Sequence, residues 1–402
     1  MADLVFVFDP ALDRPLPVPE AATPAVAEIV AAAVPAAFEA AVATATAGRA
    51  AALVILGSVL EPLRASPAQA AALRHAVTTL AAAGCRTVVV ADGTAACHDL
   101  ARMLGEPPGL CFVTPLAGCE FDVRGIAVEL VSAHGPLAAA AAPHPTGGVR
   151  RRIVVGCDSA DARSGATVVD PFTGAAGDAA PAWAQPGGFW VWGSRRPRAL
   201  PPGVHPLPAL QARDAAEPAP GSCATLALVE RATDPHGTGP LSDWRGSWRE
   251  VPTHRIAWRT VSIESPAGGD EELAAAIWSA LEARPEPPAG VLEVVRVAVA
   301  CGTSVARRVR VAEIAAETLA RLRQLHDPLA CRTWVREIFA DPHESLAPLG
   351  HARSGGRPGT TTSFSSALAD IVAELEQSAA PAVAPLLARE AGWLALELVE
   401  SV

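Results

Sequence analysis

The chain of 402 residues contains no lysine, no tyrosine and no asparagine, so all 32 of its basic residues are arginine. Without lysine it can have neither a P-loop lysine nor a lysine Schiff base, and without asparagine it can have no metal site that needs an asparagine ligand. The net charge of -10 argues against a protein that coats nucleic acid nonspecifically. Only local arginine clusters are left as candidate contacts to phosphate.

The sequence also has no run of about 18 uncharged apolar residues, the length that a membrane-spanning helix needs. Its alanine-rich stretch, residues 21–47, is interrupted by Glu28, Pro35 and Glu39. No basic N-terminal segment precedes an apolar signal core, and the eight cysteines form no C-x-x-C pair. We therefore expect a soluble, cytoplasmic protein with free thiols and no membrane association.

What is present is an alternation of short apolar runs and helical segments, which is typical of an α/β layer structure. Strands are expected at residues 4–8, 52–56, 86–91, 124–131, 151–156, 187–193 and 224–230. Ser66 followed by Pro67 predicts the start of a helix that ends at Gly84. We expect the later strands to be antiparallel, because no helix-length segment separates them.

From about Trp244 the pattern changes to strand, helix, strand, helix, which predicts a second, smaller α/β domain. The glycine- and serine-rich segment that follows has the composition of a flexible linker. An apolar helical tail then docks either on its own domain or on a partner. The expected parts are residues 1–243, 244–349, 350–366 and 367–402.

No single motif identifies a catalytic site. Ser58 follows a strand but is not part of a G-x-S-x-G elbow, and Cys97, His98 and Asp99 are helix neighbours that point to different faces. The ten histidines have no spacing that is typical of a zinc site. Two arginine clusters, residues 147–152 and 193–198, are either solvated loop ends or phosphate contacts.

The order of the fragments along the chain is more informative than any one of them. Strands run into "FDPALDRPL", "LVILGSVLEP" and "VVVADGTA", and a later aromatic strand runs into "FWVWGSRRP". Together these segments resemble the calcineurin-like metallophosphoesterases, and within them the DNA-repair exonuclease branch that supplies the nuclease subunit of SbcCD-type complexes. The resemblance implies a four-layer β-sandwich flanked by helices, and it implies that the second domain is that branch's smaller α/β capping domain.

The resemblance also implies where a metal site would lie. The family uses two Mn²⁺ or Mg²⁺ ions held by aspartate, histidine and asparagine at strand ends. Here the Asp-x-His motif keeps Asp9 but has Ala11 for histidine, and the Gly-His-x-His motif has Ser194 and Arg196 for its two histidines. The vestigial positions of the site are Asp9, Ser58, Gly93, Cys157, Ser194 and Arg196.

A single remaining carboxylate cannot hold two closely spaced cations, which repel each other unless several anionic ligands surround them. We therefore expect no catalytic residue and no metal cofactor. The chain is interpreted as a pseudoenzyme that acts as a scaffold, or as a DNA- or phosphate-binding subunit, with an SbcC-like coiled-coil ATPase. Arg195 and Arg196 are the candidate contacts to a phosphate or a DNA backbone, unless one of them pairs with Asp9.

Two alternatives remain open. Asp13, Glu61, Asp92 or Asp158 could rebuild a site for a single Mg²⁺ bound through water, which would make the chain an active phosphodiesterase or exonuclease. The chain could instead be a protein-interaction module without a nucleic-acid role, which the acidic net charge favours. The interpretation as a degenerate site requires that the ends of the candidate strands converge at one edge of the sheets.

Overall fold

The computed structural model describes residues 2–91, 94–134, 150–158, 188–195, 199–215, 217, 220–228, 246–264, 270–300, 305–325 and 332–341. The chain divides into two compact units, Met1–Ala257 and Trp258–Val402. The first unit extends past residue 243 because strand β11 (Gly246–Pro252) pairs with β10 (Ser222–Leu228). The expected linker and tail, residues 350–402, lie outside the described residues.

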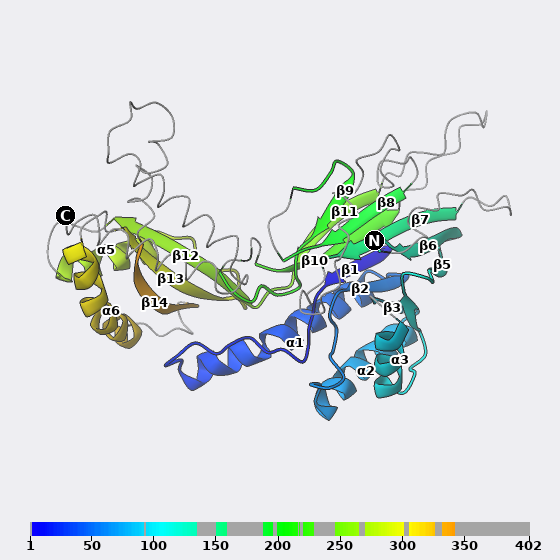
Figure 1. The fold of residues 1–402 in the computed structure, drawn as a ribbon, viewed down its shortest axis with the longest axis horizontal. Coiled ribbons are helices and arrows are strands. Elements are labelled where there is room, and N and C mark those ends of the chain that lie inside the picture. The colour runs from blue at the N-terminus through cyan, green and yellow to red at the C-terminus, as the bar shows by residue number, and fades with distance from the viewer. Residues whose placement is uncertain are drawn as a thin grey trace, which may run out of the picture. The chain divides into compact units, whose positions relative to one another are not determined.

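The first sheet of the first unit has six strands in the order β11-β10-β1-β2-β3-β4. Its parallel strands are β1 (Leu4–Phe8), β2 (Ala52–Leu56), β3 (Arg86–Val90) and β4 (Leu110–Val113). The helices that connect them are α1 (Pro24–Ala47), α2 (Pro67–Ala82) and α3 (Thr94–Leu104). These helices lie on the same face of the sheet (Figure 1). The α/β class that the sequence predicts is confirmed.

Helix α1 is long and apolar enough to cross a membrane by length and composition alone. It continues through Pro35, one of the residues expected to interrupt this stretch. Val26, Val30 and Val34 are buried on the side that contacts β1 and β2. That apolar face therefore belongs to the core of the first unit.

Helix α2 begins as the sequence predicts. Ser66 Oγ accepts a hydrogen bond of 3.3 Å from the backbone N–H of Gln69, and the Gln69 side chain accepts one of 2.8 Å from the Ser66 N–H. This capping box satisfies two backbone donors that the first turn of a helix leaves without an intrahelical partner. Pro67 at the first helical position costs nothing there, since its missing N–H would have had no intrahelical acceptor.

The second sheet has five strands in sequential order from β5 to β9. They are β5 (Cys119–Val123), β6 (Ile126–Ser132), β7 (Arg150–Cys157), β8 (Gly188–Gly193) and β9 (Val204–Leu207). β5 and β6 form an antiparallel hairpin, whereas β6 to β9 are all parallel. The expectation of antiparallel strands was wrong for β6 to β9, because the segments 133–149 and 158–187 are long enough for crossovers without a predicted helix. It is confirmed for β10, which pairs antiparallel with β1 and β11.

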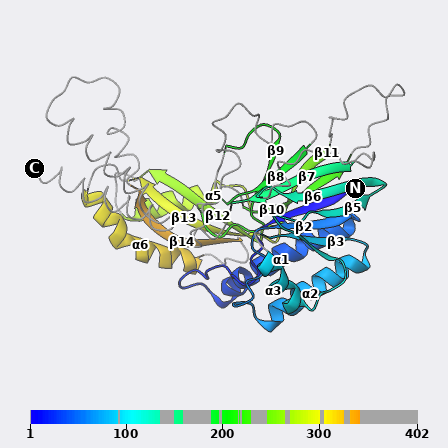
Figure 2. The same ribbon diagram turned by 45° about the vertical axis from the view of Figure 1, so that its right-hand side comes forward.

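The two sheets pack face to face, as Figure 2 shows. Alternate residues of the facing strands fill the space between them, including Leu4, Phe6, Phe8, Val54, Leu56, Ile153, Val155, Phe189 and Val191. Each such side chain contributes about 1.5–3 kcal/mol by leaving water. Among the described residues of this unit we find three layers, one of helices and two of sheets. The fourth layer that the resemblance implies is not seen in this part of the chain.

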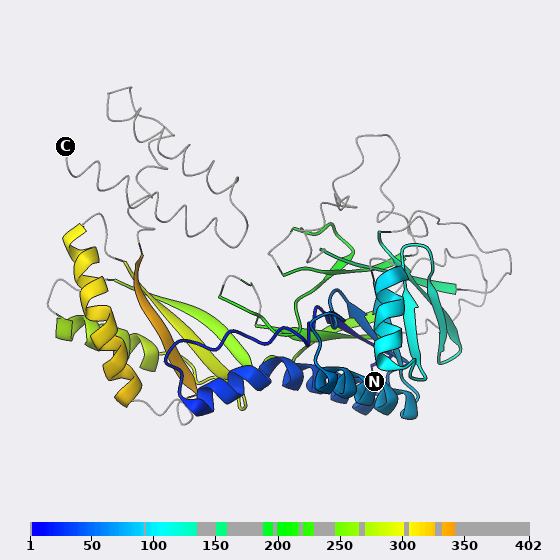
Figure 3. The same cartoon turned by 60° about the horizontal axis from the view of Figure 1, so that its bottom comes forward.

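The second unit contains a three-stranded sheet in the order β12-β13-β14, with β13 and β14 parallel. Its elements are β12 (Ile256–Glu264), α5 (Asp270–Glu282), β13 (Leu292–Ala300), α6 (Val305–Leu325) and β14 (Thr333–Asp341). Ile277 of α5 and Leu322 of α6 both pack in one cluster with Val297 of β13. The two helices therefore cover the same face of this sheet (Figure 3). The β-α-β-α pattern is confirmed, and β14 extends it by one strand.

One histidine in the first unit predicts a pH dependence of stability. The ring of His205 in β9 packs against those of Phe189 and Trp248, with centroid distances of 4.3 and 5.2 Å. Burial lowers the pKa of His205, so the fold favours the neutral imidazole. This contribution is complete above the unfolded pKa of about 6.5 and is lost as the pH falls through the lower folded pKa.

We expect urea to unfold the protein at a lower concentration at about pH 5.5 than at about pH 7.5, and His205→Gln to reduce this difference. The matched control is His98→Gln, which makes the same substitution at an exposed position on α3. An equal pH dependence in the wild type and in His205→Gln would contradict the assignment.

Candidate functional site

The ends of β1 and β2 lie side by side in the first sheet. The N–H of Asp9 donates to Leu56 O at 2.8 Å, and the N–H of Ala11 donates to Ser58 O at 2.9 Å. Asp9 is 4% exposed and has a φ of 48°, a left-handed conformation that L-residues rarely adopt. The end of β1 therefore turns sharply and holds its aspartate in the interior.

The ends of β7 and β8 lie side by side in the second sheet. Cys157 is paired in register with Gly193, and the N–H of Asp158 donates to Gly193 O at 3.0 Å. The N–H of Ser194 donates to Leu207 O at 3.2 Å, which joins the end of β8 to β9. Cys157 and Ser194 therefore come from adjacent strand ends.

Phe8 brings these two pairs of strand ends together. A Cβ atom at Gly193 would lie 2.4 Å from Phe8 Cδ2, a distance that no real contact allows. Glycine is therefore needed for β8 to pass over the phenyl ring at the end of β1. The segment after β9 is attached to the same point, since the N–H of Leu210 donates to Phe8 O at 2.9 Å.

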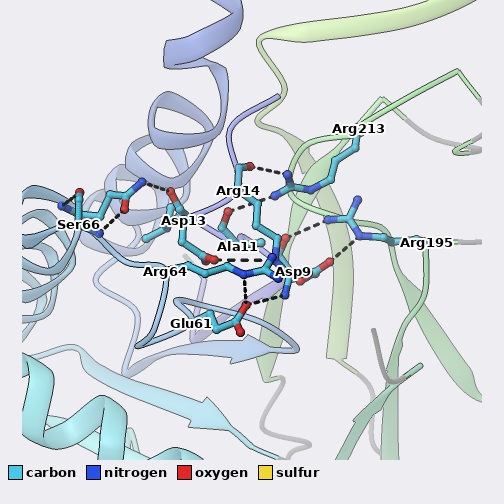
Figure 4. A network of polar contacts seen from close by, with 11 residues as sticks. Asp9, Ala11, Asp13, Arg14, Glu61, Arg64, Ser66, Arg195 and Arg213 are labelled. Atoms are coloured by element: carbon cyan, nitrogen blue, oxygen red, sulfur yellow. Dashed lines mark hydrogen bonds and ion pairs between the residues drawn. The ribbon is translucent and has the colours of Figure 1, made fainter. Parts of the chain in front are cut away.

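Arg195 links the two sheets directly. Its Nε donates to Asp9 Oδ2 at 2.5 Å, its Nη2 donates to Asp9 O at 3.2 Å, and its Nη1 donates to Glu217 Oε1 at 2.6 Å (Figure 4). Burial alone would lower the pKa of Arg195, but the attraction of Asp9 and Glu217 outweighs it and raises that pKa. The guanidinium is thus held as a cation between two carboxylates.

A second arginine secures the loop that follows β1. Arg213 donates from Nη2 to Ala11 O at 3.1 Å and from Nη1 to Arg14 O. Burial and the nearby Arg195 charge lower its pKa. The N–H of Arg213 also donates to Glu217 Oε1 at 3.1 Å, so the loop between β9 and β10 supplies both an arginine and a carboxylate.

Helix α2 and the end of β2 complete the surroundings. Glu61 pairs with Arg14 at 3.3 Å and with Arg64 at 3.2 Å, and Gln69 Nε2 donates to Leu12 O at 3.0 Å. The resulting Asp9 network contains four carboxylates and four guanidiniums, so its formal charges balance. Its members are Asp9, Asp13, Arg14, Glu61, Arg64, Arg195, Arg213 and Glu217.

The described residues do not fit a two-cation centre. Asp9 Oδ1 and both carboxylate oxygens of Asp13 have no hydrogen-bond partner among the described residues, so these atoms would be the first to bind a cation. Nevertheless, the described part of the chain holds no group of three or more His, Cys, Asp or Glu side chains that could hold a metal ion. Positive charge near Asp9 comes from arginine instead.

The structure also places the other carboxylates considered as replacement ligands. Glu61 is used by two arginines, and Asp158 Oδ1 accepts a hydrogen bond of 3.0 Å from Trp192 Nε1. These contacts do not direct Glu61 and Asp158 toward a common cation with Asp9. Asp92 and the vestigial position Gly93 lie outside the described residues.

The vestigial positions Asp9, Ser58, Cys157 and Ser194 are thus brought to strand ends that meet at one edge of the two sheets. Arg196 lies outside the described residues. The ion pairs of Arg195 argue against the predicted contact with phosphate, because Asp9 and Glu217 already compensate its charge. The alternative pairing of Arg195 with Asp9 is the arrangement that the structure has.

Three residues at the site were missed by sequence reasoning. Arg213 and Glu217 lie in a loop with no motif, and only tertiary contacts bring them to Asp9. His134, just after β6, is bonded through Nε2 to Cys157 O at 3.1 Å. Its place directly after an apolar strand was the one signal available, since polar residues at strand ends often gather at a site.

The other motifs do not form a site. Cys97 is buried while His98 and Asp99 are exposed, which confirms that these neighbours point to different faces. Asp99 pairs instead with Arg102 at 3.0 Å, one turn along α3. In the other arginine cluster, Arg152 pairs with Glu129 across β6 and β7 at 3.0 Å. No protein-family model and no curated protein matches this chain.

Proposed function

We propose that this chain is a non-catalytic relative of the calcineurin-like metallophosphoesterases, from the DNA-repair exonuclease branch. The observation that carries the proposal is the ion pair between Asp9 and Arg195 at the ends of β1 and β8. Asp9 is the one position where the sequence keeps a ligand type of that family. A carboxylate neutralised by a guanidinium is a poor ligand for a divalent cation, because the two positive charges repel each other at this distance.

The neighbouring positions support the same proposal. Two cations about 3.5–4 Å apart activate water and hold the phosphate in such enzymes, and a bridging carboxylate is needed between them. Ser58 offers a neutral hydroxyl at the corresponding place, and Ser194 offers another where an imidazole is expected. With the charges of the Asp9 network balanced internally, there is no excess negative charge to attract the cations.

We infer that the protein acts as a scaffold subunit for an SbcC-like coiled-coil ATPase and that the second unit provides the contact. The support is the resemblance of residues 244–349 to the capping domain of that branch. The second unit has its own hydrophobic core, around Ile277, Val297 and Leu322. A separate core is what an independently folded module for binding the ATPase needs. Because the Arg195 guanidinium already pairs with Asp9 and Glu217, we do not assign it a contact with DNA.

The test is a metal and nuclease assay on the purified full chain. We expect no stoichiometric manganese or other transition metal by elemental mass spectrometry, and no cleavage of single- or double-stranded DNA with added Mn²⁺. Asp9→Ala should leave both results unchanged. Metal-dependent cleavage that is lost in Asp9→Ala would overturn the proposal and favour the active phosphodiesterase with a rearranged site.

The partner is tested separately, by purifying the tagged full chain together with the SbcC-like ATPase of the same organism. We expect the two proteins to elute as one complex in size-exclusion chromatography. If the ATPase does not bind while the chain is folded by circular dichroism, the scaffold role is wrong. The interaction module without a nucleic-acid role would then be the better interpretation.

A further inference from the structure

Two cysteines lie where the edges of the two sheets of the first unit meet. Cys111 is in β4, the last strand of the six-stranded sheet, and Cys119 begins β5, the first strand of the five-stranded sheet. Between them the chain makes a tight turn in which Thr114 and Ala117 exchange backbone hydrogen bonds of 2.9 and 3.3 Å. This turn folds β5 back beside β4.

The side chains of both cysteines point into the same core between the sheets. Cys119 is 8% exposed and belongs to that core, and the partly exposed Cys111 packs against it. Each of the two thiols shifts the pKa of the other through a side-chain interaction, raising that of Cys119 and lowering that of Cys111. The tight turn and the shared core therefore bring the two thiols near one another, which is the first requirement for a disulfide.

The surroundings make one thiol of the pair acidic. The hydrogen bond from Cys119 and the positive charge of Arg86 outweigh the effect of burial and lower the pKa of Cys111 to about 6. Arg86 is held at this place because its Nη1 donates to Glu120 O at 3.1 Å. The same hydrogen bond and burial raise the pKa of Cys119. Cys111 is therefore the more acidic thiol of the pair, and Cys119 is the less acidic one.

We propose that Cys111 and Cys119 are a reversible redox pair that closes to a disulfide when a hydroperoxide oxidises the protein. The Cys111 thiolate attacks one peroxide oxygen, an S–O bond forms, the O–O bond breaks, and the departing oxide takes a proton and leaves as water or an alcohol. The Cys119 sulfur then attacks the Cys111 sulfenic sulfur. The S–S bond forms and the S–O bond breaks, while the Cys119 proton leaves with the hydroxide as a second molecule of water.

The other described cysteines provide internal controls. Cys85 and Cys223 are 1% and 0% exposed, and burial raises the pKa of each to about 11. Neither has an acidic thiol, so neither should react with peroxide in the folded protein. None of the six cysteines in the described part of the chain is in a disulfide.

Formation of the Cys111–Cys119 disulfide would also change the mobility of the strands that carry the two cysteines. A bond between Cys111 and Cys119 would link the edge strand of one sheet to the edge strand of the other. Opening of the sandwich at this edge would then be blocked in the oxidised protein. Amide hydrogen exchange in β4 and β5 is therefore expected to slow after oxidation and to recover after reduction.

The experiment uses the full chain, treated with hydrogen peroxide, alkylated under denaturing conditions and digested with trypsin. Both cysteines fall on one tryptic peptide, residues 103–124, because no arginine lies between Arg102 and Arg124. We expect this peptide to lose two hydrogen atoms and both alkyl groups on oxidation, and to regain them after dithiothreitol. The same peptide contains Met103, whose sulfoxide also adds an oxygen, so fragmentation must locate any gain of oxygen. Full alkylation of both cysteines in the oxidised protein, or a gain of oxygen on Cys111 or Cys119 that dithiothreitol does not reverse, would overturn the proposal.

Two variants separate the acidic thiol from the disulfide. Cys119→Ser keeps a hydrogen-bond donor for Cys111, so iodoacetamide labelling of Cys111 should still show a midpoint near pH 6, although no disulfide can form. Cys119→Ala removes the donor and should raise that midpoint toward the ordinary value of about 8.5. Equal labelling midpoints in the two variants would show that Cys119 does not activate Cys111, and would contradict the proposal.

Discussion

Arg195→Ala is expected to lower the free energy of unfolding of the first unit by about 3–5 kcal/mol, the cost of leaving a buried charge without its partner. The substitution removes the guanidinium that binds Asp9 and Glu217, whose side chains are only 5% and 11% exposed. Both carboxylates would have to become protonated or hydrated inside the protein. Equilibrium unfolding in urea, followed by tryptophan fluorescence, measures the effect.

The matched control is Arg64→Ala in the same network. Arg64 pairs with Glu61 at 3.2 Å, but its side chain is 56% exposed, so water replaces the ion pair at a cost of about 0–1 kcal/mol. A double-mutant cycle of Asp9→Asn and Arg195→Met should show that the second substitution costs much less after the first. If Arg195→Ala is no more destabilising than Arg64→Ala, the central role of the Asp9–Arg195 pair is refuted.

Gly193→Ala is expected to cost about 1–3 kcal/mol, the usual penalty for overpacking a well-packed core. The new methyl group would lie between 2.4 and 3.0 Å from three atoms of the Phe8 ring. Relief would need Phe8 to leave its place or β8 to move away from β1. Either change would also displace Asp9 and Arg195, so the unfolding midpoint in urea should fall and hydrogen exchange at the end of β8 should speed up.

The control for this substitution is Gly203→Ala. No atom lies within 4 Å of a Cβ at Gly203, so that variant reports only the strain of its φ of +88°. A smaller side chain in place of Phe8 should relieve the clash with the methyl group at position 193. The double variant Phe8→Leu, Gly193→Ala should therefore lose less free energy of unfolding than the sum of the two single variants. Strict additivity would show that Phe8 and Gly193 do not touch as described.

Local signals predicted most of the regular elements. Buried strands such as Leu4–Phe8 and Ala52–Leu56 were correct to the residue. Their apolar, β-branched composition and the glycines or prolines around them act over a few residues, as strand propensity does. The start of α2 was equally clear because Ser66, Pro67 and Gln69 form a complete local capping signal.

Pairing between distant segments was harder to predict. The strands β6 to β9 are parallel although the sequence predicts no helix between them, because parallel pairing needs a long crossover connection and that connection is usually, but not always, a helix. The division of the chain after Ala257 depends on the pairing of β10 with β11. Neither pairing has a signature within a short window, since register is set by which apolar faces meet in the folded core.

The candidate site shows the same limit. If the family resemblance holds, Ala11, Ser194 and Arg196 stand where the sequence would be expected to have histidines, and Asp9 stands where it would have aspartate. That Arg195 would bind Asp9 was one of several open options. Arg195 and Asp9 are 186 residues apart, so only the packing of one sheet on the other could choose between them.

By itself, the sequence determined the α/β class, the strands and the shortage of metal ligands, because composition, periodicity and local caps act within a few residues. The tertiary structure decided which charges meet: it placed Arg195 and Arg213 around Asp9 and its loop, and Cys111 beside Cys119. The physical reason is that charge compensation and thiol acidity depend on distances between groups in a poorly hydrated interior. Those distances are set by how the two sheets pack and not by the order of residues along either one.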